Sequence, residues 1–583
     1  MKRDDFSNNQ TQKAGIQWSK VITFLIGLGA LIWFLIRVIP KPSRATYPCQ
    51  RAAFPLASAF VIWLTVTLSS MFALKRLRLS LAKHPLAASL VGVFSVTLLI
   101  GFFTIMPYGI HNALGAEAAA DSTFVPAKGY SWQPGESNKP VGIARGIFPG
   151  RVVMARNPEA THWAGNWRQK EDQWWLDKNT DTEKVCELLS VTLKKITGGR
   201  NDNEAWDKIF KYYNKNSRGL NNLGYKPTET VAVKINLNNS SGNKADNLTD
   251  ATPQMVLAMV RQLVYNAHVP QNKIIVYDAR RTIAPAILTE VWKEFKDVRF
   301  VQERVAAADQ PINPSYGNHK GIEMADWKEG ITYSFGTYNE AKQIPRQIIE
   351  ATYLVNLALL KVHSYPYNYM EGMGEGETAF TLSAKNHFGS IRAPWELHNK
   401  INPTREATKN AYSPLVDLAA SPNLGGKTIL FILDGLYSGR KWHSYPIHFP
   451  NPPFNNKVTP YENTEWPACV LASLDEVAIE SVGIDILQAQ SKNNTEPSYH
   501  NVPRIMIRDN ADDFLLEMAT PDNAPSGIKY MQDGKPVKSL GVHEHWDNDQ
   551  TMRYSRNLNP KTGKGIEFIY IPLGSATQLS TTN

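Results

Sequence analysis

Cysteine is scarce in this chain. Its 583 residues include three cysteines, Cys49, Cys186 and Cys469, which lie far apart in the sequence. An iron–sulfur cluster or a zinc ribbon commonly needs four thiolates, and a CxxC redox centre needs two that are close together. Neither can be built within one chain here. The commonest thiol-based cofactors are therefore excluded, and no cysteine-ligated iron–sulfur cluster is expected.

Charge is almost absent from three long apolar runs near the N-terminus, 21–39, 56–74 and 86–106, where Arg37 is the one charged residue. Each run is close to the ~20 residues that a helix needs to cross a bilayer. A cleaved signal peptide accounts for one such run but not for three. Buried core helices are the alternative, although successive apolar runs of this length are rare in soluble domains. The runs predict three transmembrane helices within a membrane module over 1–115.

The distribution of basic residues predicts the orientation of this module. The N-terminal tail and the loop between the second and third runs hold eight of them, against four on the opposite side, where Arg37 at the end of the first run is included. The eight are Lys2, Arg3, Lys13, Lys20, Lys75, Arg76, Arg78 and Lys83. Because basic loops stay in the cytoplasm, the chain from residue 116 onward is expected on the extracytoplasmic side, which in a bacterium is the periplasm.

The net charge of +10 indicates a lipid bilayer as partner rather than a nucleic acid. Much of the basic excess flanks the apolar runs, and no nucleic-acid-binding module is recognisable elsewhere in the chain. Small residues in the first run, Gly27, Gly29 and Ala30, offer a packing surface for helices of other membrane subunits.

After a linker over 116–145, residues 146–575 alternate between strand and helix patterns, and 576–583 form a tail. The expected strands are 231–237, 273–277, 298–302, 353–360 and 428–433, and the expected helices are 253–267, 286–296 and 470–488. Alternation of this kind is typical of an α/β fold, with a mostly parallel sheet and flanking helices.

Polar residues follow four of these strands. In a parallel sheet, ligands bind beyond the carboxyl ends of the strands, so these residues are expected to share one rim. They are Asn236, Asn238, Asp278, Lys361, His363 and Asp434. At a single position, a turn or a helix cap is the competing explanation. Lys234 differs because it lies inside a strand, where a lysine needs a partner or a function unless the strand is at an edge of the sheet.

The segment 361–392 has the densest set of chemically active side chains. It contains Lys361, His363, Lys385, Asn386 and His387 around an acidic, Gly-rich stretch. Grouped lysines and histidines can bind an anion, ligate a metal or exchange protons near neutral pH. The sequence GMGEGE is not a phosphate loop, because it lacks the Gly-Lys-Ser/Thr ending.

Two metal sites are compatible with the sequence. One combines His363 and His387 with acidic neighbours from 371–377, and solvation of those glutamates is its alternative. The other is GVHEHWDND, where His543 and His545 point to the same side of a strand, with Asp547 and Asp549 nearby. A solvated loop is the alternative there, and the spacing is not that of HExxH. A divalent metal therefore stays open as a cofactor.

Several stretches resemble domain-of-unknown-function family 362 over roughly 146–570. They are VAVKINLN, ATYLVNLALLKVHS, TLSAKNHFGSI, LGGKTILFILDGLY and LASLDEVAIESVGIDIL, while PGRVVMARNPEATHW and GVHEHWDNDQTMRYSRNL resemble its long, exported branch. The resemblance implies no known reaction. Some relatives carry ferredoxin-like modules, which the cysteine count excludes here. Where relatives have an Asp-Pro and a second Asp, this chain has Glu476 and Glu480, which puts a role for Asp475 in doubt.

Together these features predict a membrane-anchored extracytoplasmic protein with an enzyme-like site for a small anionic substrate or cofactor, with or without a metal. The expected catalytic residues are His363, His387, Lys361 and Lys385, and the expected binding residues are Lys234, Asn236, Asp278, Asn386 and Asp434. Whether the chain is an enzyme stays open. The alternative is a binding or assembly subunit of a membrane complex.

Overall fold

The computed structural model divides the chain into two compact units, 1–122 and 123–583. The residues described are Ile32 and 136–574, apart from 167–168, 170, 239–246, 304–320, 364–379, 399–411, 440–443, 455–464, 492–511 and 562–563. Among them, no helix combines the length and the apolar character needed to cross a bilayer. Apart from Ile32, the three predicted spans lie outside the described residues and stay a prediction.

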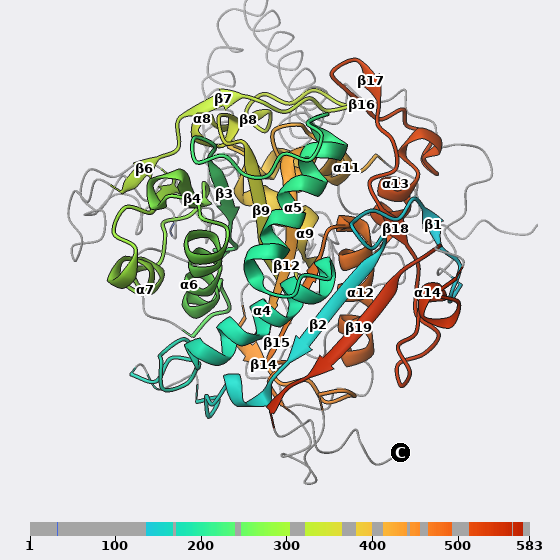
Figure 1. The fold of residues 1–583 in the computed structure, drawn as a ribbon. Helices are drawn as coiled ribbons and strands as arrows, with labels where there is room; N and C mark the ends of the chain where they lie inside the picture. The colour runs from blue at the N-terminus through green and yellow to red at the C-terminus, as the bar shows by residue number, and fades with distance from the viewer. Residues whose placement is uncertain are drawn as a thin grey trace, which may run out of the picture. The chain divides into compact units, whose positions relative to one another are not determined.

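A nine-stranded sheet forms the centre of the second unit (Figure 1). Its strands, in order across the sheet, are β19 (Glu567–Pro572), β2 (Arg151–Arg156), β15 (Cys469–Ser473), β12 (Thr428–Gly435), β9 (Tyr353–Leu359), β3 (Val231–Lys234), β4 (Ile274–Asp278), β5 (Arg299–Gln302) and β6 (Ile322–Met324). Neighbouring strands are parallel except beside β15, which is antiparallel to both β2 and β12. The prediction of an α/β fold with a mostly parallel sheet is confirmed.

Helices cover both faces of this sheet. One face carries α4 (Thr182–Thr197), α5 (Asp202–Ser217), α6 (Pro253–Arg261) and α7 (Pro285–Glu294), and the other carries α9 (Ser383–Asn386), α11 (Pro414–Ala420), α12 (Glu476–Ser491) and α13 (Asp513–Ala519). Figure 1 shows α4 and α5 in front of the strands and α12 behind β2 and β19. Three further helices have one turn each: α8 (Arg346–Ile349), α10 (Trp395–His398) and α14 (Ser555–Leu558).

Among the residues that the structure describes, five short strand pairs accompany the sheet. They are β1 (Val141–Gly142) with β18 (Val542–His543), β7 (Trp327–Glu329) with β8 (Gln343–Pro345), β10 (Lys361–Val362) with β11 (Phe380–Thr381), β13 (Ser438–Gly439) with β14 (Pro446–Ile447), and β16 (Met531–Gln532) with β17 (Lys535–Pro536). Two of the pairs carry residues of the predicted sites. The pair β10–β11 lies directly after β9, and β18 carries the first of the C-terminal histidines.

Each central strand contributes to two separate cores because side chains alternate between the faces of a sheet. In β3, Val231 and Val233 belong to the core under α4 to α7, whereas Ala232 belongs to the core under α9 and α12. All residues of β3, β4 and β9 are buried. Burial on both faces explains why these strands are continuous apolar runs in the sequence.

The predicted helix over 470–488 is wrong in its first part. Residues Cys469–Ser473 form strand β15, and helix α12 begins at Glu476. Asp475 separates the two elements: its Oδ1 accepts the backbone N–H of Ala478 at 3.0 Å, as an N-cap residue does. A short apolar run beside a helix does not reveal its own period, so the boundary was not visible in the sequence.

Candidate functional site

A buried ion pair lies at the carboxyl ends of β3 and β4. Lys234 Nζ is 3.1 Å from Asp278 Oδ2, and the two side chains are 0% and 5% exposed. Asp278 Oδ2 also accepts the backbone N–H of Leu237 at 3.2 Å. Burial lowers the pKa of Lys234, and the charge of Asp278 opposes that shift. Two residues predicted from separate strands therefore meet directly.

Register explains why Lys234 points toward α9. In β3 it is two residues from Ala232, so it shares the face that α9 and α12 cover. Its partner across the neighbouring strand is Asn356 of β9, which is two residues from Leu354 on the same face. The sheet thus places an ammonium group and an amide side by side beneath α9.

Asn386, at the end of α9, connects these groups. Its Oδ1 is 3.1 Å from Lys234 Nζ and 3.3 Å from Asn236 Nδ2, and its Nδ2 donates to Asn356 Oδ1 at 2.8 Å. Asn356 Nδ2 in turn donates to the Ser383 carbonyl at 2.9 Å. Every one of these side chains is at least nine-tenths buried. The predicted Lys234, Asn236, Asp278 and Asn386 therefore form one network.

Gly389 lets the chain after α9 approach the ion pair closely. A Cβ at this position would lie 2.6 Å from both Lys234 Nζ and Asp278 Oδ2. The Gly389 carbonyl accepts the backbone N–H of Ala279 at 2.8 Å, which fixes the turn against the end of β4. A side chain here would have to displace the pair.

His387 is held inside the protein by both ring nitrogens. Its Nε2 lies 3.3 Å from Asn356 Nδ2, and its Nδ1 lies 3.3 Å from Ser390 Oγ, which also contacts the Tyr277 hydroxyl at 3.0 Å. Burial, aided by the charge of Lys234, lowers the pKa of His387 to about 3. The imidazole is therefore neutral at physiological pH and is engaged in positioning Asn356.

Lys361 and Lys385 form a second cationic group beside the first. They are 0% and 5% exposed. Burial lowers the pKa of Lys361 to about 8; the repulsion from Lys385 acts in the same direction and the charge of Asp250 acts against it. Lys385 directly precedes Asn386 on α9, so this helix joins the two groups. His363 is also buried, with its Nδ1 2.5 Å from Thr381 Oγ1 on β11.

Asp434 has a different role from the other predicted residues. Its two carboxylate oxygens accept the backbone N–H groups of Thr252 at 3.2 Å and Leu436 at 3.1 Å. Thr252 is the N-cap residue of α6, so Asp434 fastens the start of that helix to the end of β12. Within the described part of the chain, no hydrogen bond joins it to Lys234 or Lys361. For Asp434, helix capping is therefore the explanation that fits the structure.

A buried carboxyl group of α12 holds α9 in place. Glu480 Oε1 accepts the backbone N–H of Ala384 at 2.8 Å, and burial raises the pKa of Glu480 to about 8. Glu476, one helical turn earlier, also has a raised pKa because of burial and the charge of Glu480. The sequence pattern singled out both glutamates, but the hydrogen bond from α9 to Glu480 was not predicted.

Two buried polar atoms near this network have no hydrogen-bond partner among the described residues. They are Asn236 Oδ1 and Ser383 Oγ. Such atoms are rare in folded proteins and indicate contact with a ligand or a water molecule. Their residues belong to the loop after β3 and to the start of α9.

The metal site predicted around His363 and His387 does not form as a cluster of three ligands among the described residues, and Glu371, Glu375 and Glu377 lie outside them. The groups close enough to hold a metal are Asp512, His543 and His545. His543 and His545 were predicted to act together. The predicted carboxylates Asp547 and Asp549 instead bond to the loop around them.

Asn356, Ser383, Ser390 and Gly389 are parts of the site that sequence reasoning missed. One signal for Asn356 was available: it is the single polar residue in the apolar run YLVNLALL, two positions from Leu354 and Ala358 on the same face. The others follow from the way α9 and the turn after it cross the ends of the strands, which no local pattern encodes.

Residues 231–485 match the family described as a domain of unknown function, DUF362. The matched segment begins with β3 and ends inside α12, so it contains the whole network around Lys234 and α9 and excludes His543 and His545. The predicted resemblance to this family is confirmed. Searches among curated proteins and among solved structures gave no significant match.

Proposed function

We propose that the chain binds a small anionic substrate or cofactor at the carboxyl ends of β3, β4 and β9, and that His363 exchanges a proton with it. The observation that carries the proposal is the placement of three buried lysines around α9: Lys234, Lys361 and Lys385. Buried like charges are costly unless an opposite charge offsets them. Asp278 offsets Lys234, and the charge of Asp250 acts on Lys361, while Lys361 and Lys385 repel each other.

The roles of the two cationic groups differ. Lys234 is tied to Asp278 and Asn386, so it stabilises the rim on which the ligand rests. Lys361 and Lys385 supply the charge that attracts the anion, and charge-assisted hydrogen bonds are the stronger kind. We assign the proton exchange to His363 because burial lowers the pKa of His387, the other predicted histidine, to about 3.

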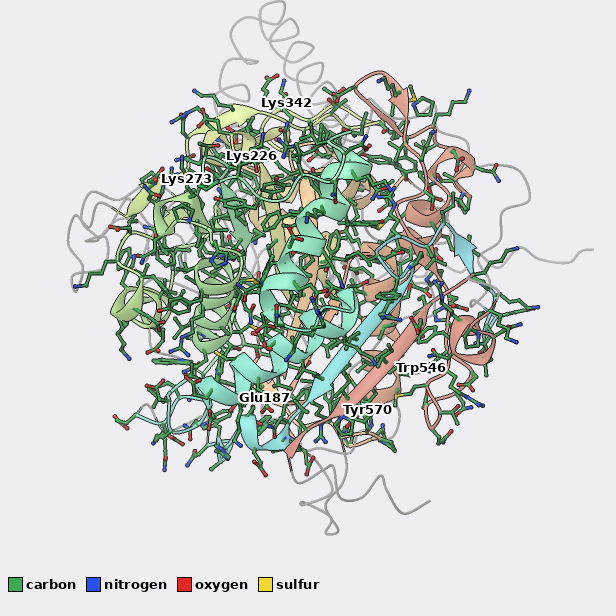
Figure 2. All side chains as sticks on the ribbon, viewed as in Figure 1. Glu187, Lys226, Lys273, Lys342, Trp546 and Tyr570 are labelled. Atoms are coloured by element: carbon green, nitrogen blue, oxygen red, sulfur yellow. The ribbon has the colours of Figure 1, made fainter. Side chains whose placement is uncertain are left out.

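Replacing Lys361 with glutamine is expected to weaken the binding of inorganic phosphate by about 10–100-fold, since a hydrogen bond to a charged group contributes about 1.5–3 kcal/mol. Isothermal titration of the full chain in detergent measures this change. Lys226→Gln is the matched control, because Lys226 is an exposed lysine of the same unit (Figure 2). Equal affinities of Lys361→Gln and the wild type for phosphate would show that the anion site is not here.

Phosphate binding is also expected to weaken as the pH rises through about 8, the pKa of Lys361. A bound anion favours the ammonium form, so binding should take up a proton near that pH. Titrations at pH 8 in two buffers with different ionisation enthalpies measure the uptake. It should be present in the wild type and smaller in Lys361→Gln. Uptake of the same size in both proteins would contradict the assignment.

For the N-terminal unit we propose three membrane spans that leave residues 116–583 outside the cytoplasm. The support is the distribution of basic residues, eight against four, on the two sides. A reporter that is active only outside the cytoplasm should therefore work when it is fused after Gly115 and fail when it is fused within 75–83. The reversed pattern would remove the extracytoplasmic assignment and leave the anion site untouched.

A further inference from the structure

We infer that Asp512, His543 and His545 form a binding site for a divalent transition-metal ion of the zinc class. One ring nitrogen of each histidine and one carboxylate oxygen of Asp512 lie within 4.8 Å of one another. Ligand atoms around a tetrahedral ion, at bond lengths of about 2.0–2.2 Å, lie about 3.4 Å apart. Small side-chain rotations therefore suffice to close the site around an ion.

The hydrogen bonds of His543 leave its Nε2 available as a ligand. Ser481 Oγ donates its hydrogen to the Val477 carbonyl at 2.7 Å, so it can only accept from His543 Nδ1, which lies 2.9 Å away. A neutral imidazole that donates through Nδ1 keeps an unshared electron pair on Nε2. His543 is 3% exposed. Its tautomer is thus fixed in the form that binds a metal through Nε2.

His545 is oriented in the same way by a carboxylate. Its Nδ1 is 2.7 Å from Asp485 Oδ1, and its Nε2 is 2.9 Å from Asp512 Oδ2. Asp485 is itself held by the backbone N–H of Trp546 at 3.1 Å and by the Tyr554 hydroxyl at 2.8 Å (Trp546 is labelled in Figure 2). A carboxylate behind a metal-ligating histidine is the usual outer contact of such sites. On binding, the ion replaces the proton on Nε2, which leaves to solvent.

Asp512 gives an independent indication of a ligand. It is the N-cap residue of α13, yet its side chain makes no capping hydrogen bond, although aspartate at this position commonly does. Its Oδ2 is turned to His545, and its Oδ1 is buried with no hydrogen-bond partner among the described residues. The side chain is 5% exposed. An unsatisfied buried carboxylate oxygen is the group that a cation would complete.

Helix α12 supplies the outer contacts of both histidines. Ser481 and Asp485 are four residues apart, so they lie on one face of this helix and meet the extended segment that carries His543 and His545. Two imidazole nitrogens and one carboxylate oxygen leave a fourth position open, the arrangement of zinc sites that also bind water or a substrate. The three ligands lie outside the segment 231–485, whereas their outer contacts Ser481 and Asp485 lie within it.

The test uses the full chain, purified in detergent without a histidine tag, freed of metal with a chelator and dialysed against Zn²⁺. We expect one zinc ion per chain by elemental analysis and, with Co²⁺, the intense visible absorption of a four-coordinate site. His543→Gln and Asp512→Asn should lose stoichiometric binding. His162→Gln, which replaces an exposed histidine of the same unit, should keep it.

A variant of Asp485, which contacts His545 but is not one of the three ligands, distinguishes a metal site from a cluster of charges. Asp485→Asn keeps all three ligands and should weaken zinc binding by about 10–100-fold. X-ray absorption at the zinc edge of the wild type should show two imidazoles, a readout that needs no variant to fold. Absence of stoichiometric zinc in the folded wild type, or a zinc environment without two imidazoles, would mean that Asp485 and Asp512 only neutralise a protonated His545.

Discussion

Replacing Lys234 with methionine is expected to lower the free energy of unfolding by about 3–5 kcal/mol, because it leaves the carboxylate of Asp278 buried without its cation. Methionine nearly matches the length of lysine, so little volume is lost. The remaining donors to Asp278 are the backbone N–H groups of Leu237 and Arg280, which do not carry a charge. Urea unfolding of the full chain, followed by tryptophan fluorescence, measures the change.

The double variant Lys234→Met/Asp278→Asn tests whether the loss of stability comes from leaving one charge of the pair buried alone. Since it removes both charges, it should recover most of the lost stability. Lys211→Met serves as a control for an ion pair at the surface, because Lys211 and Asp207 are more than one-third exposed. Its expected cost is below ~1 kcal/mol. If Lys234→Met costs no more than Lys211→Met, the ion pair does not organise the site.

The central strands could be predicted from the sequence, whereas the order in which the strands pair in the sheet could not. Strands β3, β4, β9 and β12 are short apolar runs bounded by turn residues, and each was found within a few residues of its true bounds. Pairing β15 between β2 and β12 requires contacts between segments more than 300 residues apart, such as Val470 with Ala155. No local pattern specifies such a partner. The direction of β15 was therefore outside what the sequence could reveal.

The site was predictable where polar residues follow strands and unpredictable where helices cross them. Lys234 and Asp278 were expected at one rim and are in contact. Asp434 was expected there on the same argument, but its carboxylate caps α6, which is the commoner use of an aspartate after a strand. His387 carried a strong signal as an ionisable residue, yet its burial depends on tertiary packing, and that packing keeps it neutral.

A second large effect is expected from Glu480→Gln, which should raise the free energy of unfolding at pH 7. Burial raises the pKa of Glu480 to about 8, so the folded chain holds a proton that the unfolded chain releases above about pH 4.5. Between these two pKa values, loss of the proton stabilises the unfolded state as the pH rises. The free energy of unfolding is thereby lowered by about 3 kcal/mol at pH 7. Glutamine cannot ionise, and its amide oxygen can still accept the backbone N–H of Ala384.

The sign of this effect distinguishes a buried neutral carboxyl from a stabilising ion pair. If a carboxylate is paired with a cation in the folded chain, the free energy of unfolding falls as the pH falls. With Glu480 buried as a neutral carboxyl, the free energy of unfolding should instead fall as the pH rises from about 4.5 to about 8. Unfolding of the wild type and Glu480→Gln should therefore coincide near pH 4.5 and diverge toward pH 8, with the variant more stable. Glu187→Gln, on the exposed side of α4, controls for the loss of one carboxyl (Figure 2). A variant that is less stable than the wild type at pH 8 would show that Glu480 is ionised in the folded chain and that α9 is anchored by a charge rather than by a neutral acid.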